Sequence, residues 1–96
     1  MTTTDSAWRG FLNALQSIKT PHALNECLTF FLTHEEKATL TTRYLLTQEL
    51  LKGELTQREI AKKFGVSIAK ITRGSNSLKL LSPALKQELT QLLLKS

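Results

Sequence analysis

A helix-turn-helix signature in the second half of the chain constrains its fold more than any other feature. Thr56, followed three residues later by Glu59, is a capping box, in which a hydroxyl and a carboxylate bond the unpaired amides of a helix start. Gly65 can adopt the positive φ of a sharp turn, and Ser67 can cap the next helix. We therefore predict two short helices joined by a tight turn, the first beginning near Gln57.

Basic residues are concentrated in the same stretch. Of the 13 Lys and Arg residues, seven lie between residues 52 and 79, a segment with only two acids. These seven are Lys52, Arg58, Lys62, Lys63, Lys70, Arg73 and Lys79. Phosphate binding favours one sign of charge, whereas a solvated helix face tends to mix signs. We interpret the motif as DNA-binding; an ordinary structural corner between two helices is the alternative.

The 96 residues are expected to form one small helical domain, residues 1–96, with the helix-turn-helix at about 57–79. The hydrophobic core of so small a domain gives it limited stability, and oligomerisation would bury more apolar surface and increase that stability. The net charge of +5 fits a polyanion, although an acidic membrane surface would attract it too. No apolar run reaches the roughly 18 residues of a membrane span, and the N-terminus does not resemble a signal peptide. We expect a cytoplasmic protein.

Catalytic and metal-binding patterns are missing from the sequence. Cys27 is the only cysteine, which excludes an internal disulfide and a Cys-based zinc site, and we expect its side chain to be buried. His22 and His34 are isolated from it and from each other, so no metal site is predicted. There is no phosphate-binding Gly loop, nucleophile elbow or His-centred triad, and Glu49 is interpreted as solvent-exposed. We expect neither an enzyme nor a cofactor.

Apolar residues recur at helical spacing along the rest of the chain, and no stretch alternates with period two. Residues 1–5 are expected to be frayed, and Trp8 is expected to lie in the core. Besides the two motif helices, we predict helices over Ser6–Lys19, Pro21–Phe31, His34–Lys52 and Pro83–Lys95. The fold class is therefore all-α, with about six helices.

The long helix is apolar around much of its circumference, because Leu40, Tyr44, Leu45, Leu46, Leu50 and Leu51 do not form one stripe. A chain of this length has difficulty surrounding such a helix, so we infer that a second chain covers part of it. Arg43 is unusual in this setting, and spacing alone suggests a carboxylate partner or a snorkelling side chain. Gly74 leaves two possibilities open: it ends the second motif helix, or it allows close approach of a phosphate or ligand.

The segment ITRGSNSLK (residues 71–79), with LTTRYLLTQELLKGELTQRE (40–59) before it and LLLKS (92–96) after it, resembles the bacterial tryptophan repressor family. The resemblance covers about residues 32–96, and the N-terminal third matches only in its helix pattern. It implies an intertwined homodimer that binds L-tryptophan and, when liganded, a palindromic operator of tryptophan genes. Tryptophan would act as a corepressor.

The resemblance also implies a ligand site. Arg43 and Arg73 match the two arginines that sandwich the indole, an arrangement that suits planar cations, and this replaces the interpretation of Arg43 from spacing. Gly74 would lie against the ring, where a Cβ would intrude. The other positions carried over are the carboxylate-side hydroxyl of Thr33, the partner-subunit carbonyls of Phe30 and Leu32 as acceptors for the α-amino group, Thr47 on the pocket floor and Ser77 as a further polar contact.

For DNA, the resemblance assigns Arg58 to guanine in the major groove, where its guanidinium can contact O6 and N7. The remaining expected DNA-binding residues are Gln57, Lys62, Ser67, Ile68, Ala69, Lys70, Thr72, Asn76 and Lys79, of which Gln57, Asn76 and Lys79 match phosphate-contacting positions. Operator affinity should therefore fall by orders of magnitude between about 50 and 200 mM salt.

Four positions depart from the family pattern. Lys70 replaces a threonine on the recognition helix, and Ala61 replaces a lysine on the first motif helix. Phe30 replaces a leucine at the pocket rim, and Thr47 replaces a small apolar residue. These changes leave two other hypotheses besides the tryptophan-activated repressor. One is a helix-turn-helix protein that is constitutive or responds to another ligand, and the other is a helical interaction module.

Overall fold

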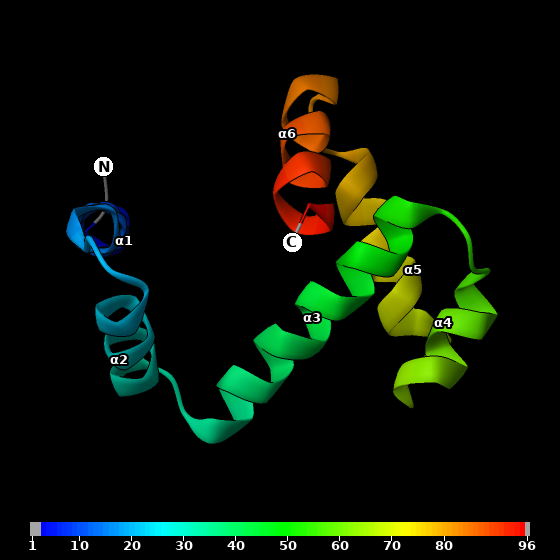
Figure 1. Cartoon of the computed structure of the whole chain (residues 1–96), viewed down its shortest axis with the longest axis horizontal. Helices are drawn as coiled ribbons and strands as arrows, with labels where there is room; N and C mark the ends of the chain where they lie inside the picture. Colours follow the sequence, from blue (N-terminus) through cyan, green and yellow to red (C-terminus); the bar gives the residue numbers. More distant parts are fainter. Residues whose placement is uncertain (1–2, 96) are drawn as a thin grey trace. The chain divides into compact units, whose positions relative to one another are not determined.

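The computed structural model describes residues 3–95, and every regular element among them is a helix. The six helices are α1 (Thr3–Ser17), α2 (Pro21–Phe31), α3 (His34–Lys52), α4 (Gln57–Phe64), α5 (Ile68–Lys79) and α6 (Pro83–Leu94), shown in Figure 1. The predicted all-α class is confirmed. None of the described helices is long and apolar enough to cross a membrane.

Helix boundaries follow local chemistry closely. The predicted limits of α2 and α3 are confirmed, and α6 ends one residue before the predicted Lys95. For the first helix the prediction is wrong at both ends, because α1 begins at Thr3 instead of Ser6, so that residues 3–5 are helical, and it ends at Ser17 instead of Lys19. Residues 1 and 2 of the segment expected to be frayed lie outside the described part of the chain.

The chain divides into two compact units, residues 1–37 and 38–96, and the division falls within α3. Whether both belong to the single expected domain stays a prediction. In the first unit, the ring of Phe11 on α1 meets the ring of Phe31 on α2 edge-on, with 5.2 Å between centroids. No residue of α1 or α2 is fully buried. This unit therefore has aromatic contacts but no closed core.

The second unit holds the hydrophobic core. Its buried side chains are Leu46 on α3, Ile60 and Ala61 on α4 and Ile71 on α5, and both isoleucines are fully buried. Small Ala61 at this contact lets two short helices approach closely. Two residues after Leu46 on α3, Gln48 donates a 2.7 Å hydrogen bond to the carbonyl of Leu93, which connects α3 to α6.

The helix-turn-helix forms as predicted. Thr56 and Glu59 make both hydrogen bonds of the capping box, at 3.1 and 2.9 Å. The bond from the Thr56 backbone amide, with a further contribution from the Thr56 side chain, holds the pKa of the Glu59 carboxyl below its usual value. Gly65 ends α4 with φ +65°, and the Ser67 hydroxyl caps α5 by accepting from the amide of Lys70. α4 and α5 lie side by side in Figure 1.

Gly74 does not end the second motif helix. α5 continues through it without interruption to Lys79, so the small-residue run Gly74–Ser77 is helical. Of the two possibilities that the sequence left open, the helix stop at Arg73 is excluded. The reason is tertiary: Gly74 packs against α3, where a Cβ would meet Leu50 Cδ1 at 3.4 Å.

Glu49 corrects another expectation, because it is 7% exposed and not at the surface. Its carboxylate accepts a 2.5 Å hydrogen bond from the ammonium of Lys63 on α4. This bond holds the pKa of Glu49 below its usual value and outweighs the opposing effect of burial, with a further contribution from the charge of Lys52. The Glu49–Lys63 ion pair thus attaches α4 to α3.

Many large apolar side chains are exposed. Trp8, expected in the core, is 59% exposed, and Cys27 is half-buried instead of buried. On α3, Leu40 is 48% exposed, and Tyr44 and Leu45 are exposed as well. One chain therefore leaves part of the apolar surface of α3 exposed, and its coverage by a second chain stays a prediction.

We predict that Glu49→Gln destabilises the protein at neutral pH. The folded pKa of Glu49 is lowered, so the ion pair stabilises the fold above the unfolded value of about 4.5, and this contribution is lost as pH falls through the folded pKa. Denaturant unfolding at about pH 7 and about pH 3 should show a wild-type advantage that shrinks in acid. Glu54→Gln, which removes an exposed carboxylate nearby, is the control; an equal loss at both pH values would contradict the assignment.

Candidate functional site

A cavity of about 600 Å³ opens in the second unit, a size usual for small-molecule sites. Sixteen residues line it, from α3, α5, α6 and the segments beside α5. Three of them are cations, Arg43, Lys70 and Arg73, and none is an acid. The cavity is thus suited to a partly apolar ligand that carries a negative group.

Five of the eight predicted ligand residues line this one cavity, namely Arg43, Thr47, Arg73, Gly74 and Ser77. Arg43 and Thr47 are four residues apart on α3, and Arg73 and Ser77 are four apart on α5, so each pair shares a helix face. Their part in binding stays a prediction, but the structure brings them together.

The other three predicted ligand residues, Phe30, Leu32 and Thr33, belong to the first unit and do not line this cavity. Phe30 is 80% exposed, and its ring meets that of Phe31. The Thr33 hydroxyl caps α3 by accepting from the amide of Glu36, and its own proton stays available to an acceptor on a ligand. Their proposed contribution from a partner subunit stays a prediction.

Thr47 departs from the family pattern, and the structure shows why a hydroxyl is tolerated there. It donates a 2.7 Å hydrogen bond to the carbonyl of Arg43, one turn earlier on α3. A ligand therefore does not have to satisfy the Thr47 proton, and the cost of placing a hydroxyl beside an apolar ring is small.

Several residues of the cavity were missed from the sequence. Thr39, Leu46 and Leu50 lie four residues before, three after and seven after Arg43, so helical spacing could have found them. The same argument from Arg73 finds Lys70, three residues earlier. The remaining missed residues are Ala38, Thr42, Val66, Ile71, Leu78, Leu81 and Leu89, and those beyond the two helices carry no local signal.

The predicted DNA-binding residues all lie on the helix-turn-helix. Gln57, Arg58 and Lys62 are on α4, Ser67 caps α5, and Ile68, Ala69, Lys70, Thr72, Asn76 and Lys79 are on α5. All ten are exposed. Ile68 is a large apolar side chain exposed in the first turn of α5, where it can contact a thymine methyl group in a major groove.

A side-chain hydrogen bond joins the two helices on this surface. The Thr72 hydroxyl donates to the Gln57 amide oxygen at 2.9 Å. With its oxygen occupied, the Gln57 amide is left with its NH₂ group as a donor, which suits a phosphate oxygen. The α4 N-terminus, where Gln57 stands, also favours anions.

Two opposite sides of α5 have different surroundings. Lys70, Arg73 and Ser77 follow helical spacing on the side that lines the cavity. Ile68, Thr72 and Lys79 fall about half a turn from Lys70 at ~100° per residue, and Asn76 lies between the two sides. One helix therefore separates the cavity from the expected DNA surface.

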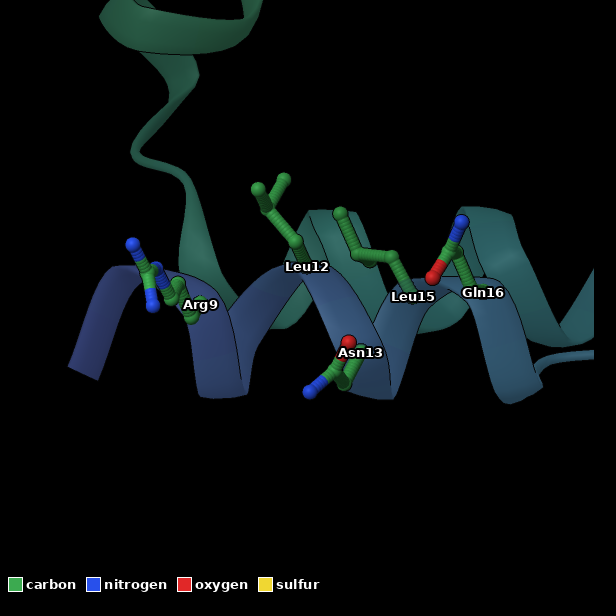
Figure 2. Close-up of a pocket in the computed structure, with 5 residues that line it drawn as sticks. All are labelled: Arg9, Leu12, Asn13, Leu15 and Gln16. Atoms are coloured by element: carbon green, nitrogen blue, oxygen red, sulfur yellow. The ribbon is translucent and has the colours of Figure 1, made fainter. Parts of the chain in front are cut away.

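A second hollow lies on α1, lined by Arg9, Leu12, Asn13, Leu15 and Gln16. Figure 2 shows these side chains spread along a single helix, so no second element closes the hollow. Within residues 3–95 no group of three or more His, Cys, Asp or Glu side chains could hold a metal ion.

The capped helix pair, its basic exposed residues and the cavity behind α5 define a class: a helix-turn-helix DNA-binding regulator with a small-molecule site. Comparison with known proteins makes this specific. The family model described as "Trp repressor protein" matches residues 6–93. The chain belongs to the Trp repressor family, whose members are DNA-binding transcription regulators, not enzymes, and use tryptophan as corepressor.

Individual relatives support this membership. A protein of Chlamydia caviae named "Trp operon repressor homolog" is 48% identical over 88 residues, covering 92% of this chain and 87% of its own. Relatives of the same name are 46% identical over 83 residues in Chlamydia trachomatis serovar D, covering 86% and 88%, and 53% identical over 66 residues in Vibrio vulnificus strain YJ016, covering 69% and 65%.

We predict that Gly74→Ala weakens ligand binding without lowering the unfolding stability of the protein. Alanine in a helix interior is favoured over glycine by about 0.5–1 kcal/mol, and the added Cβ would meet only the flexible end of Leu50 at 3.4 Å. Because this methyl group would enter the cavity, we expect L-tryptophan affinity to fall by at least about tenfold while unfolding stability is kept or raised.

Gly10→Ala is the matched control, since Gly10 lies inside α1 with nothing within 4 Å of an added Cβ. Calorimetric titration and denaturant unfolding of both variants would measure the two effects. Wild-type affinity in Gly74→Ala would place the indole elsewhere.

Proposed function

We propose that this protein is a cytoplasmic, L-tryptophan-activated repressor that binds a palindromic operator of tryptophan biosynthesis or uptake genes as an intertwined homodimer. The observation that carries this proposal is the double use of α5. One side of α5 carries Arg73 and lines a cavity to which α3 contributes Arg43. The other side of α5 carries exposed residues of the helix-turn-helix.

The cavity is continuous with the core that positions the motif. Leu46 and Ile71 are buried core residues and also line the cavity, as do the partly buried Leu50 and Val66. An indole ring bound there would add apolar contacts between α3 and α5. The ligand would therefore favour the arrangement of α5 in which those contacts are made, and would shift the population toward it by its differential affinity.

Arg43 and Arg73 account for the preference of the proposed site for an aromatic ligand with a carboxylate. Planar guanidinium groups can stack on an electron-rich ring, and the absence of an acid among the lining residues favours a carboxylate. The α-ammonium group would bond the carbonyls of Phe30 and Leu32 from the partner subunit, which the cavity of one chain does not include.

A homodimer is supported by the apolar surface of α3, where Leu40, Tyr44 and Leu45 are exposed in one chain. A second copy would cover these side chains and would supply a second recognition helix. Two such helices about 34 Å apart would match one turn of DNA and a palindromic site.

Substitutions of two arginines test the functional assignment. We expect Arg73→Ala to abolish the tryptophan response and leave weak nonspecific DNA binding, because it removes a cavity cation. We expect Arg58→Ala to weaken operator binding about tenfold to hundredfold, as the loss of a base contact does, with tryptophan affinity retained. Calorimetry with L-tryptophan and anisotropy with a duplex selected from a random library would measure both.

Lys86→Ala, which removes an exposed cation from α6, is the control for loss of charge alone. A tryptophan response that persists in Arg73→Ala would overturn the ligand assignment. DNA binding indifferent to tryptophan in the wild type would favour a constitutive or differently liganded regulator. No sequence-specific DNA binding at all would favour a helical interaction module.

The proposed homodimer predicts that a charge introduced at Leu40 weakens subunit association. A glutamate at this 48% exposed position should cost little in an isolated chain, but it would place a charge in a subunit interface. We therefore expect sedimentation equilibrium to give about twice the 10.8 kDa chain mass for the wild type and a clear shift toward the monomer for Leu40→Glu. Identical masses for the two proteins would contradict the interface.

A further inference from the structure

Lys70 takes part in the cavity and not only in the recognition helix. It lines the cavity together with Arg43 and Arg73, and no Asp or Glu lines it. Family resemblance assigns this position to DNA contact, where a threonine is usual. The structure separates the two roles, because the cavity and the expected DNA surface lie on different sides of α5.

Helical phase places Lys70 on the cavity side. Arg73 and Ser77 follow it by three and seven residues, which is the spacing of one helix face, and both line the cavity. Lys79 follows it by nine residues, or two and a half turns at ~3.6 residues per turn, and so lies on the opposite side. Thr72, whose hydroxyl bonds Gln57, lies on that opposite side too.

Local electrostatics also indicate an anion near Lys70. Lys70 lies in the first turn of α5, where the helix dipole disfavours a cation, and no acid in that turn offsets it. Arg73, one turn later, adds like-charge repulsion. A bound carboxylate would relieve both effects, because it would lie near the positive end of the helix and between two cations.

We propose that Lys70 is a specificity residue of the ligand site and pairs with the carboxylate of the bound ligand beside Arg73. This inference rests on the proposed function, since it concerns the same cavity. It makes the site of this chain more cationic than the threonine of the family pattern would. Lys70 is then a ligand contact that reaches DNA only indirectly.

Calorimetric titration with L-tryptophan and with indole-3-propionate, in the absence of DNA, tests the inference. Lys70→Gln should weaken both ligands by about threefold to tenfold, the range for a partly exposed charge pair, and Lys70→Arg should restore them. Lys79→Gln is the matched control on the opposite side of α5. It should leave ligand affinity unchanged and make the salt dependence of DNA binding shallower by about two units per dimer.

The inference is overturned if Lys70→Gln binds L-tryptophan as tightly as the wild type, and a shallower salt dependence in that variant would then assign Lys70 to DNA. Failure of the proposed function looks different, because the wild type itself would not bind L-tryptophan. Helical circular dichroism of each variant would show that these exposed substitutions leave the fold intact.

Discussion

A core of four side chains holds the helix-turn-helix to the long helix, and the other features of the second unit depend on it. Ile60 and Ile71 are fully buried, one from each motif helix, and Leu46 contributes from α3. Because this core is small, few buried apolar contacts fix the position of α5. The cavity lies at its border and shares Leu46 and Ile71 with it. Occupying the cavity therefore changes the number of apolar contacts that position the recognition helix.

Charge is distributed unevenly around this core. The buried Glu49 is paired with Lys63 and so helps to fix α4 on α3. The charged residues that line the cavity, in contrast, are all cations. The helix-turn-helix segment is rich in basic residues as well. The basic side chains around α5 repel one another, and a bound anion on either side of the helix would reduce this repulsion. A ligand carboxylate and DNA phosphates can thus both favour the same placement of α5.

The apolar surface has a matching consequence for assembly. Trp8 in the first unit is 59% exposed and Leu40 on α3 is 48% exposed, although both are large apolar side chains. Exposed apolar area on this scale is unfavourable in water and favours association. The three predicted ligand residues of the first unit, Phe30, Leu32 and Thr33, are not among the residues that line the cavity, and the homodimer proposed above would supply them from the partner subunit.

Local sequence signals determined most of the secondary structure. The capping box at Thr56, the glycine turn at Gly65 and Pro21 after Thr20 act over three or four residues, so the limits of α4 and the start of α2 could be predicted from the chain alone. Arg43 and Thr47, like Arg73 and Ser77, are four residues apart and share a helix face, but the family resemblance, not this spacing, placed them in one predicted site. Recognition of the family supplied their roles.

Tertiary structure decided the features that depend on neighbours from distant parts of the chain. Glu49 is buried because Lys63, fourteen residues later, reaches it from α4. Gly74 stays helical because α3 packs beside it, and Lys70 lines the cavity because α5 turns that side toward α3. Spacing shows which residues share a face of one helix, but only the packing of helices determines what that face meets. The sequence by itself therefore determined the elements and their faces, and the tertiary structure decided which of these faces form the cavity.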